Sequence, residues 1–164
     1  MIARYNSNGS LDNTFGSGGI VSTDLLGDFD RASSLVITAD GKMVVAGGTF
    51  TPSVFSDFAL VRYNSNGSLD ATFGSGGVVI TDFFGGFDFC SCISLQPDGK
   101  LVAGGDAISN TLGSILGIAR YNSDGSLDAT FGVGGRSNDT TRVSARGVAV
   151  LPNGKIIVGG LGFS

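Results

Sequence analysis

Aspartate is the main side chain in this sequence that could carry acid–base or metal chemistry. The chain has 14 acidic residues, all of them Asp, and it contains neither His nor Glu. Without His, neither a Ser-His-Asp triad nor a Cys-His pair can form. Catalysis would depend on Asp, Lys and Tyr alone, and no Asp stands out from its equivalents in a repeated pattern described below. We therefore expect a protein that is not an enzyme and has no catalytic residue.

Two acidic patterns place oxygen ligands at spacings loosely like those of a calcium loop. The first covers residues 6–12 and recurs in copies that end at Asp70 and Asp128. It lacks the distal bidentate Glu and is fully explained by a hairpin turn with Asx-type hydrogen bonds. The second covers residues 23–30 and is echoed at residues 81–88. The sequence favours turns over calcium sites, so we expect no metal site and no cofactor.

Cys90 and Cys92 are the chain's two cysteines. At this spacing in a strand they would lie on one side, poorly placed for a mutual disulfide. No further Cys or His is present to complete a zinc site, so we expect both to be small buried residues. The glycine-rich segments 16–19 and 74–77 lack the Lys-Ser/Thr that follows a phosphate-binding loop, and we expect them to be turns.

Charge and hydropathy exclude two classes of partner. The net charge is −4, and no cluster of basic residues interrupts the sequence, which argues against binding to nucleic acid. No segment approaches the ~18 consecutive apolar residues that span a bilayer, so no membrane insertion is expected. The N-terminus also lacks the charged and apolar regions of a signal peptide.

A tandem repeat dominates the sequence. Residues 4–12 recur at 62–70 and, with one Asn replaced by Asp, at 120–128, which gives a period of 58 residues twice (Tyr5 to Tyr63 to Tyr121). A second motif follows in each unit, Asp/Asn-Gly-Lys with an apolar run and a Gly-Gly pair. Relative to the first unit, the second and third lose one residue after this Lys. The units cover about residues 1–57, 58–116 and 117–164, and we expect one array that starts and ends within a blade.

Each unit carries two hairpin turns, which gives six Asn-Gly or Asp-Gly dipeptides between apolar runs rich in Val, Ile, Leu, Phe or Tyr. We expect type I′ turns or closely related ones. In the second copy the expected strands are residues 58–63, 69–73, 78–81, 92–96 and 101–103. About four strands per 58 residues is close to one propeller blade, and no sustained helical periodicity is present. The predicted fold is all-β: a β-propeller-type array of three four-stranded antiparallel repeats, open or forming a partial ring.

Residues 62–77, 96–100 and 102–105 resemble the delta-60 repeat, a tandem repeat of bacterial proteins that are often predicted to be surface-exposed or secreted. The resemblance covers essentially the whole chain. It implies a β-propeller-like repeat with an NHL-type blade pattern and an extracellular or cell-surface location. The family has no established catalytic activity, so it assigns no functional residue.

Recognition is expected on the connections between strands, because these are the segments that differ between the repeats. The hairpin turns should emerge at one face, and connections such as residues 49–57 and 106–117 at the other. The candidate interaction residues are Phe50, Phe55, Asp57, Asn110 and Leu112. The favoured function is a scaffold that binds a protein or glycan, as part of a larger surface protein. The alternatives are a purely structural repeat segment and, least favoured, a metal-dependent propeller hydrolase.

The core is expected on three aligned inner strands. Their inward positions form equivalent pairs, namely Leu35 and Ile37, Ile93 and Leu95, and Val148 and Val150. Three blades are fewer than the four to eight of known propellers, so the chain is not expected to close a ring alone. Either two copies join as a two-fold, six-bladed homodimer, or further repeats of a longer chain complete the ring.

Overall fold

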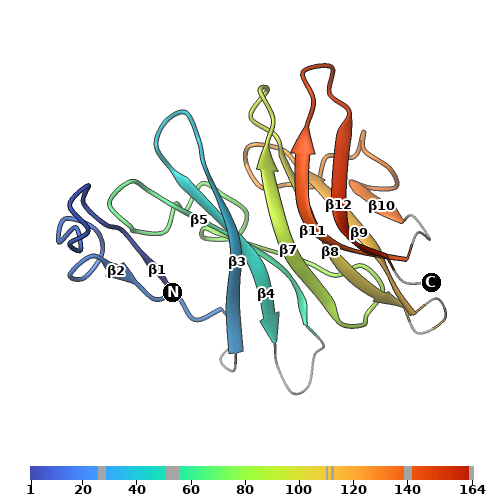
Figure 1. Ribbon diagram of the computed structural model, residues 1–164, viewed down its shortest axis with the longest axis horizontal. Helices are drawn as coiled ribbons and strands as arrows, with labels where there is room; N and C mark the ends of the chain where they lie inside the picture. The colour runs from blue at the N-terminus through green and yellow to red at the C-terminus, as the bar shows by residue number, and fades with distance from the viewer. Residues whose placement is uncertain (26–28, 51–55, 110, 112, 139–141, 163–164) are drawn as a thin grey trace.

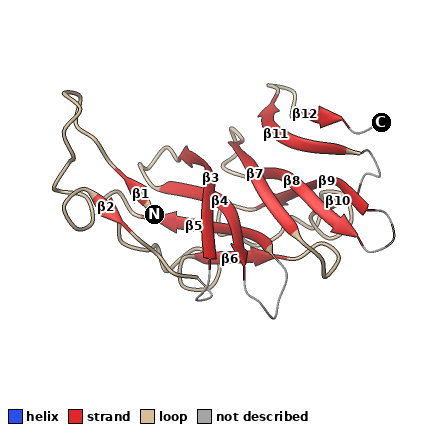
Figure 2. Ribbon diagram, turned by 60° about the horizontal axis from the view of Figure 1, so that its bottom comes forward, coloured by secondary structure: helices blue, strands red, loops and turns tan. Residues whose placement is uncertain are grey.

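A computed structural model describes residues 1–25, 29–50, 56–109, 111, 113–138 and 142–162, and these form strands, turns and loops with no helix (Figures 1 and 2). The first blade contains β3 (Phe29–Ile37), β4 (Met43–Phe50), β5 (Asp57–Tyr63) and β6 (Val78–Thr81). The second blade contains β7 (Asp88–Leu95), β8 (Leu101–Ser109), β9 (Gly113–Tyr121) and β10 (Arg136–Asn138). Both are antiparallel sheets in which neighbours in sequence are neighbours in space.

A two-stranded sheet lies at each end of the array. The N-terminal half-blade pairs β1 (Ile2–Ala3) with β2 (Ile20–Val21), and the C-terminal half-blade pairs β11 (Val143–Val150) with β12 (Ile156–Gly162). By their place in the repeat, the former is the outer half of a blade and the latter is the inner half. The prediction of an all-β, unclosed, propeller-like array is confirmed, with two complete blades and two halves.

The blades do not coincide with the sequence repeats. Each complete blade takes its two inner strands from one repeat and its two outer strands from the next, because the repeat boundary near residue 57 falls between β4 and β5. Residues 69–73 are not the strand that was expected: Leu69 forms an isolated bridge to Tyr63, and turns follow. The outer strand is β6, at the residues 78–81 that were also expected to form a strand.

The six Asn-Gly and Asp-Gly turns contain three residues rather than two. In the first, the amide of Gly9 donates to the carbonyl of Asn6 (3.0 Å), and the amide of Asn6 donates to the carbonyl of Ser10 (2.8 Å). The glycine has a positive φ of 79–92° in all six turns, but no other residue type in the described segments has a positive φ. A type I′ turn needs positive φ at both central residues, so the turns are not type I′ but one of the closely related forms that were also expected. The geometry fits a type I turn followed by a glycine bulge.

Apolar clusters join each sheet to the next. Between the two blades, Val44, Phe58 and Leu60 pack against Ile93 and Leu101. A second cluster joins the second blade to the C-terminal half-blade through residues that include Val102, Ile118, Val148, Val150, Ile156 and Val158. A third joins the first blade to Ile2 and Val21 of the N-terminal half-blade.

The predicted core is right for the second and third inner strands and wrong for the first. Ile93 is buried, and Leu95, Val148 and Val150 are partly buried against the clusters. Leu35 and Ile37, in contrast, are 55% and 63% exposed. The reason is their position: they lie on the face of the first blade that would meet a preceding blade.

Each inner strand has a β-bulge at the same place, between Ala32 and Ser34, Cys90 and Cys92, and Ala145 and Gly147. The bulge sends Cys90 into the cluster between the blades and Cys92 into the cluster on the opposite face. The expectation that the two thiols lie on one side is therefore wrong, whereas their burial is confirmed. Burial raises the pKa of both thiols, that of Cys92 to about 11.

The hairpin turns of the inner strands gather at one end of the array, and the last residues of β4 and β8 lie with the first residues of β5 and β9 at the other (Figure 1). We call the latter the connection end. Residues 106–117 are mostly strand, because β8 continues to Ser109 and β9 begins at Gly113. None of the described residues belongs to a helix long and apolar enough to cross a membrane.

Candidate functional site

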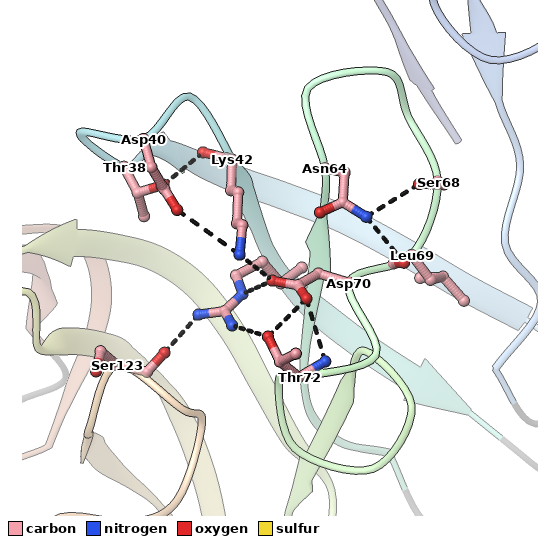
Figure 3. A network of polar contacts seen from close by, with 10 residues as sticks. Thr38, Asp40, Lys42, Asn64, Ser68, Leu69, Asp70, Thr72 and Ser123 are labelled. Carbon is pink, nitrogen blue, oxygen red and sulfur yellow. Dashed lines mark hydrogen bonds and ion pairs between the residues drawn. The ribbon is translucent and has the colours of Figure 1, made fainter.

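A repeated polar network links the inner hairpin of each complete blade to its outer strands. Arg62 Nε donates to Asp70 Oδ2 at 2.7 Å, and Lys42 Nζ lies 2.9 Å from the same oxygen (Figure 3). Asp70 Oδ1 accepts from the hydroxyl of Thr72 (2.7 Å), and the guanidinium of Arg62 lies over the ring of Phe73 (4.5 Å). The ion pair expected between Arg and the Asp eight residues later is confirmed, and Lys42 is an addition to it.

The second blade repeats these contacts. Asp128 Oδ2 lies 2.8 Å from Arg120 Nε and 2.9 Å from Lys100 Nζ. Hydrogen bonds from Lys42 and Thr72, together with the charge of Arg62, hold the pKa of Asp70 well below its usual range. Lys100, Thr130 and Arg120 do the same for Asp128.

The same arginines tie each repeat to the next. Arg4 Nη1 donates to the carbonyl of Ser65 (2.5 Å), and Arg62 Nη1 donates to that of Ser123. The amide of Gly74 donates to the carbonyl of Asp124 (2.8 Å). Within the first complete blade, Arg62, Lys42 and Asp70 are all bonded to protein atoms, so we assign this network to structure rather than to ligand binding.

Two of the predicted interaction residues are described, and both lie at the connection end. Phe50 ends β4 and is partly exposed. Asp57 begins β5 and is buried, so the expectation that it lies in an exposed loop is wrong. Phe55, Asn110 and Leu112 lie outside the described residues.

An exposed aromatic pair lies at this end, between the two blades. The rings of Phe50 and Phe87 are nearly parallel, with centroids 6.2 Å apart and an interplanar angle of 13°. They remain 37% and 43% exposed. Phe29, also exposed, is the cross-strand neighbour of Phe50 on β3. Together these three residues form what we call the Phe surface.

Three carboxylates lie close together at the same end. Asp57 on β5, Asp82 after β6 and Asp88 on β7 each offer an oxygen within 4.8 Å of the others. Asp88 accepts hydrogen bonds from the amides of Phe83 (2.6 Å) and Ile108 (3.2 Å). Asp82 accepts one from the amide of Gly85 (2.6 Å). Asp88 directly follows Phe87 in the chain, and Thr49, opposite Asp57 in the ladder, directly precedes Phe50, so both groups lie at the connection end.

Burial and mutual repulsion raise the pKa of two of these carboxyl groups. Burial is the main cause for Asp88, whose pKa rises to about 6, while its two amide donors oppose the rise. Burial, and then the charge of Asp82, raise the pKa of Asp57. The hydroxyl of Thr49, directly across the ladder from Asp57, is buried and has no hydrogen-bond partner among the described residues.

The site therefore combines an apolar surface with hydrogen-bond acceptors, which is the usual composition of a binding site. Carboxylate oxygens can accept hydroxyl protons and are also the ligands that hard cations such as Ca²⁺ prefer. Two of the three carboxylates are already committed to backbone amides, and three fall short of the six to eight oxygens of a calcium site. Of the three carboxylates, Asp82 is exposed, whereas Asp57 and Asp88 are buried.

Sequence reasoning missed Phe87, Asp82 and Asp88 as members of this site. Asp82 and Asp88 were noticed only as an echo of residues 23–30, and Asp57 only as a variable position. One signal was available: Asp57 aligns with Ile115 in the next repeat, an exchange of an apolar residue for a charged one. What could not be read is that β5 and β7 start side by side at the junction between blades.

Repeated antiparallel blades and a structural Arg-Asp-Lys network define this chain as a β-propeller repeat protein. It belongs to the family described as domain of unknown function (DUF5122) beta-propeller, whose profile matches residues 2–15, 38–73 and 96–131. These segments include every copy of the Arg-Asp motif. A comparison with curated proteins gave no match.

Proposed function

We propose that this chain is a non-enzymatic propeller scaffold that binds a glycan at the Phe surface. The observation that carries the proposal is the exposed, nearly parallel Phe50–Phe87 pair beside the carboxylates of Asp57, Asp82 and Asp88. One face of a sugar ring presents C–H groups that pack on an aromatic ring, and its hydroxyls need acceptors at the rim. A protein partner could use the same aromatic surface, but the exposed carboxylate of Asp82 at the same end, an acceptor for hydroxyl groups, favours the sugar.

The resemblance to the delta-60 repeat supports a wider setting for this function. In that setting the chain is part of a larger bacterial protein that is secreted or held at the cell surface. The rigid blades would present the connection end to the ligand, since variable segments on a fixed scaffold are the usual place for recognition.

A glycan array probed with the chain would test the proposal. Positive glycans are then titrated by calorimetry against the wild type and against Phe87→Ala. We expect Phe87→Ala to weaken binding at least about tenfold, as for a central aromatic contact. The matched control is Val133→Ala, which removes another exposed apolar side chain, on a glycine-rich loop.

Three results would contradict glycan binding at this site. Equal losses in both variants would show that the effect is not local. Binding that survives Phe87→Ala would place the ligand elsewhere. No glycan on the array, combined with a protein captured in a pull-down that Phe87→Ala abolishes, would identify a protein-binding surface; capture of nothing would favour a purely structural repeat segment.

A further inference from the structure

The two half-blades are complementary. In the complete blades, the second inner strand pairs with the first outer strand, as β4 does with β5 and β8 with β9. In the described structure β12 pairs only with β11, and β1 pairs only with β2. One half-blade thus presents the free edge of an inner hairpin, and the other presents the free edge of an outer pair.

Charged groups of the two half-blades are also complementary. Lys42 and Lys100 pair with Asp70 and Asp128 of their own blades. The equivalent Lys155 has no acidic partner among the described residues, and the equivalent Asp12 has Arg4 but no lysine. Each half-blade carries the charge that the other lacks.

A second unmatched donor supports the same arrangement. Arg4 and Arg62 each donate through Nη1 to a serine carbonyl in the following hairpin. Arg120 donates to Asp128 and Thr130, but its Nη1 has no acceptor within the part of the chain that the structure describes. The hairpin that would supply that carbonyl corresponds to residues 4–12.

Apolar faces at the two ends of the array match as well. Leu35 and Ile37 are exposed on the first blade, and Ile157 is 53% exposed on β12. The residues equivalent to Ile157 are Val44 and Val102, which are fully buried. A groove next to Leu35 separates β1 from the first blade, lined by Met1, Ile2, Ala3, Ala32, Ser33, Ser34, Leu35 and Val45.

We propose that a second copy of this chain fills that groove with its β11–β12 hairpin, and receives the hairpin of the first copy in return. In each composite blade, β12 of one copy pairs with β1 of the other in the antiparallel register of β4 with β5. That register places Val158 opposite Ala3 of the second copy, as Val45 lies opposite Val61. It also brings Lys155 to Asp12 and the Nη1 of Arg120 to the carbonyl of Ser7.

The number of copies follows from the number of blades. Two complete blades and two halves are equivalent to three blades, and propellers contain about four to eight. One copy is too few and three copies would give about nine blades, outside that range. Two copies of residues 1–164 give six blades and a two-fold ring in which the free edges of both described half-blades are paired.

Engineered disulfides would test the register. The background is Cys90→Ala with Cys92→Ser, which installs the residues found at the equivalent positions of the first blade, Ala32 and Ser34. Ala3→Cys with Val158→Cys should then oxidise to a covalent dimer, because opposite residues in a ladder lie within disulfide range. Ala3→Cys with Ile157→Cys is the control, since Ile157 points to the other face of the strand and should give little or no cross-link.

Light scattering of the oxidised and unmodified proteins distinguishes the outcomes. A species of twice the chain mass of 16.6 kDa, cross-linked only by the first pair, supports the proposal. A folded monomer at tens of micromolar overturns it. A cross-link within one chain would indicate three-bladed closure, and a series of larger species would indicate open-ended assembly; either overturns the two-copy ring.

A charge variant gives an independent measurement. In the proposed dimer, Lys155→Glu places a carboxylate beside Asp12 of the other copy at both contacts. Because like charges repel, the dissociation constant of the dimer should rise about tenfold or more. Lys100→Glu is the matched control, because its partner Asp128 is in the same chain. An equal effect of both variants on dimerisation, or an effect of neither, would contradict the proposed register. Loss of glycan binding at the Phe surface would leave this result unaffected.

Discussion

Lys42 lies 2.9 Å from the carboxylate of Asp70 and thereby joins the inner hairpin of the first blade to its outer strands. Arg62 reaches the same carboxylate from β5 and continues to the backbone of Ser123 in the next repeat. One aspartate therefore holds two hairpins of a blade together, and its arginine connects that blade to its neighbour. This explains why Arg, Asp and Lys recur at fixed positions without forming a ligand site.

Replacing this arginine should destabilise the fold according to its burial. Arg62→Ala removes the contacts to Asp70, Thr72 and Ser123 in a mostly buried setting, so we expect a loss of about 1–3 kcal/mol in the free energy of unfolding. Arg4→Ala removes the same contacts where they are more exposed. Its cost should be about 0–1 kcal/mol. Urea denaturation measures both, and equal costs would show that burial does not govern the contribution of the network.

Stability should pass through a maximum at mildly acidic pH. The folded-state pKa of Asp88 is about 6, above the value of about 3.9 in an unfolded chain. The folded protein therefore binds more protons between these values, and stability rises as the pH falls from 7 towards 4. The pKa of Asp70 is lowered on folding, so its contribution is lost as the pH falls below about 4.

Asp88→Asn should remove the rise in stability that occurs as the pH falls from 7 to 5. The wild type should gain about 1 kcal/mol between pH 7 and pH 5, and the variant should gain less because its side chain does not titrate. Chemical denaturation at a series of pH values gives the comparison. An unchanged slope between pH 5 and pH 7 would show that Asp88 is not the group responsible.

The repeat allowed the fold to be predicted, but local geometry could not be read from it. When the Gly-Gly pairs of the three units are aligned in sequence, the second and third units come out one residue shorter than the first after Lys100 and Lys155. The ladders instead align Gly47 with Gly105, the second glycine of the later pair, and no residue is lost. The site depended on packing between blades, which brings Asp57 to Asp88 and has no signature in the repeat motif.

Core substitutions should destabilise the fold more on an inner strand covered by a neighbouring blade than on the uncovered inner strand of the first blade. Ile93→Ala removes a buried side chain and should cost about 2–4 kcal/mol by leaving a cavity. Leu35→Ala changes the equivalent position on the uncovered face and should cost less than about 1 kcal/mol in a monomeric chain. The comparison is made in the Lys155→Glu background to limit dimerisation. A cost below about 0.5 kcal/mol for Ile93→Ala would show that β7 is misplaced.

The bulge in each inner strand should make one glycine of the facing strand irreplaceable. A Cβ at Gly47 would lie 1.7 Å from the carbonyl oxygen of Arg31, and at Gly105 it would lie 1.9 Å from that of Phe89. Since the obstacle is backbone, Gly47→Ala should cost about 3 kcal/mol or more. Gly147→Ala is the control, because among the described residues no atom other than those of its chain neighbours lies within 4 Å of its Cβ position, and it should change stability by less than about 0.5 kcal/mol. Thermal and urea denaturation measure both variants, and a mild effect at Gly47 would show that the bulge lies elsewhere on β3.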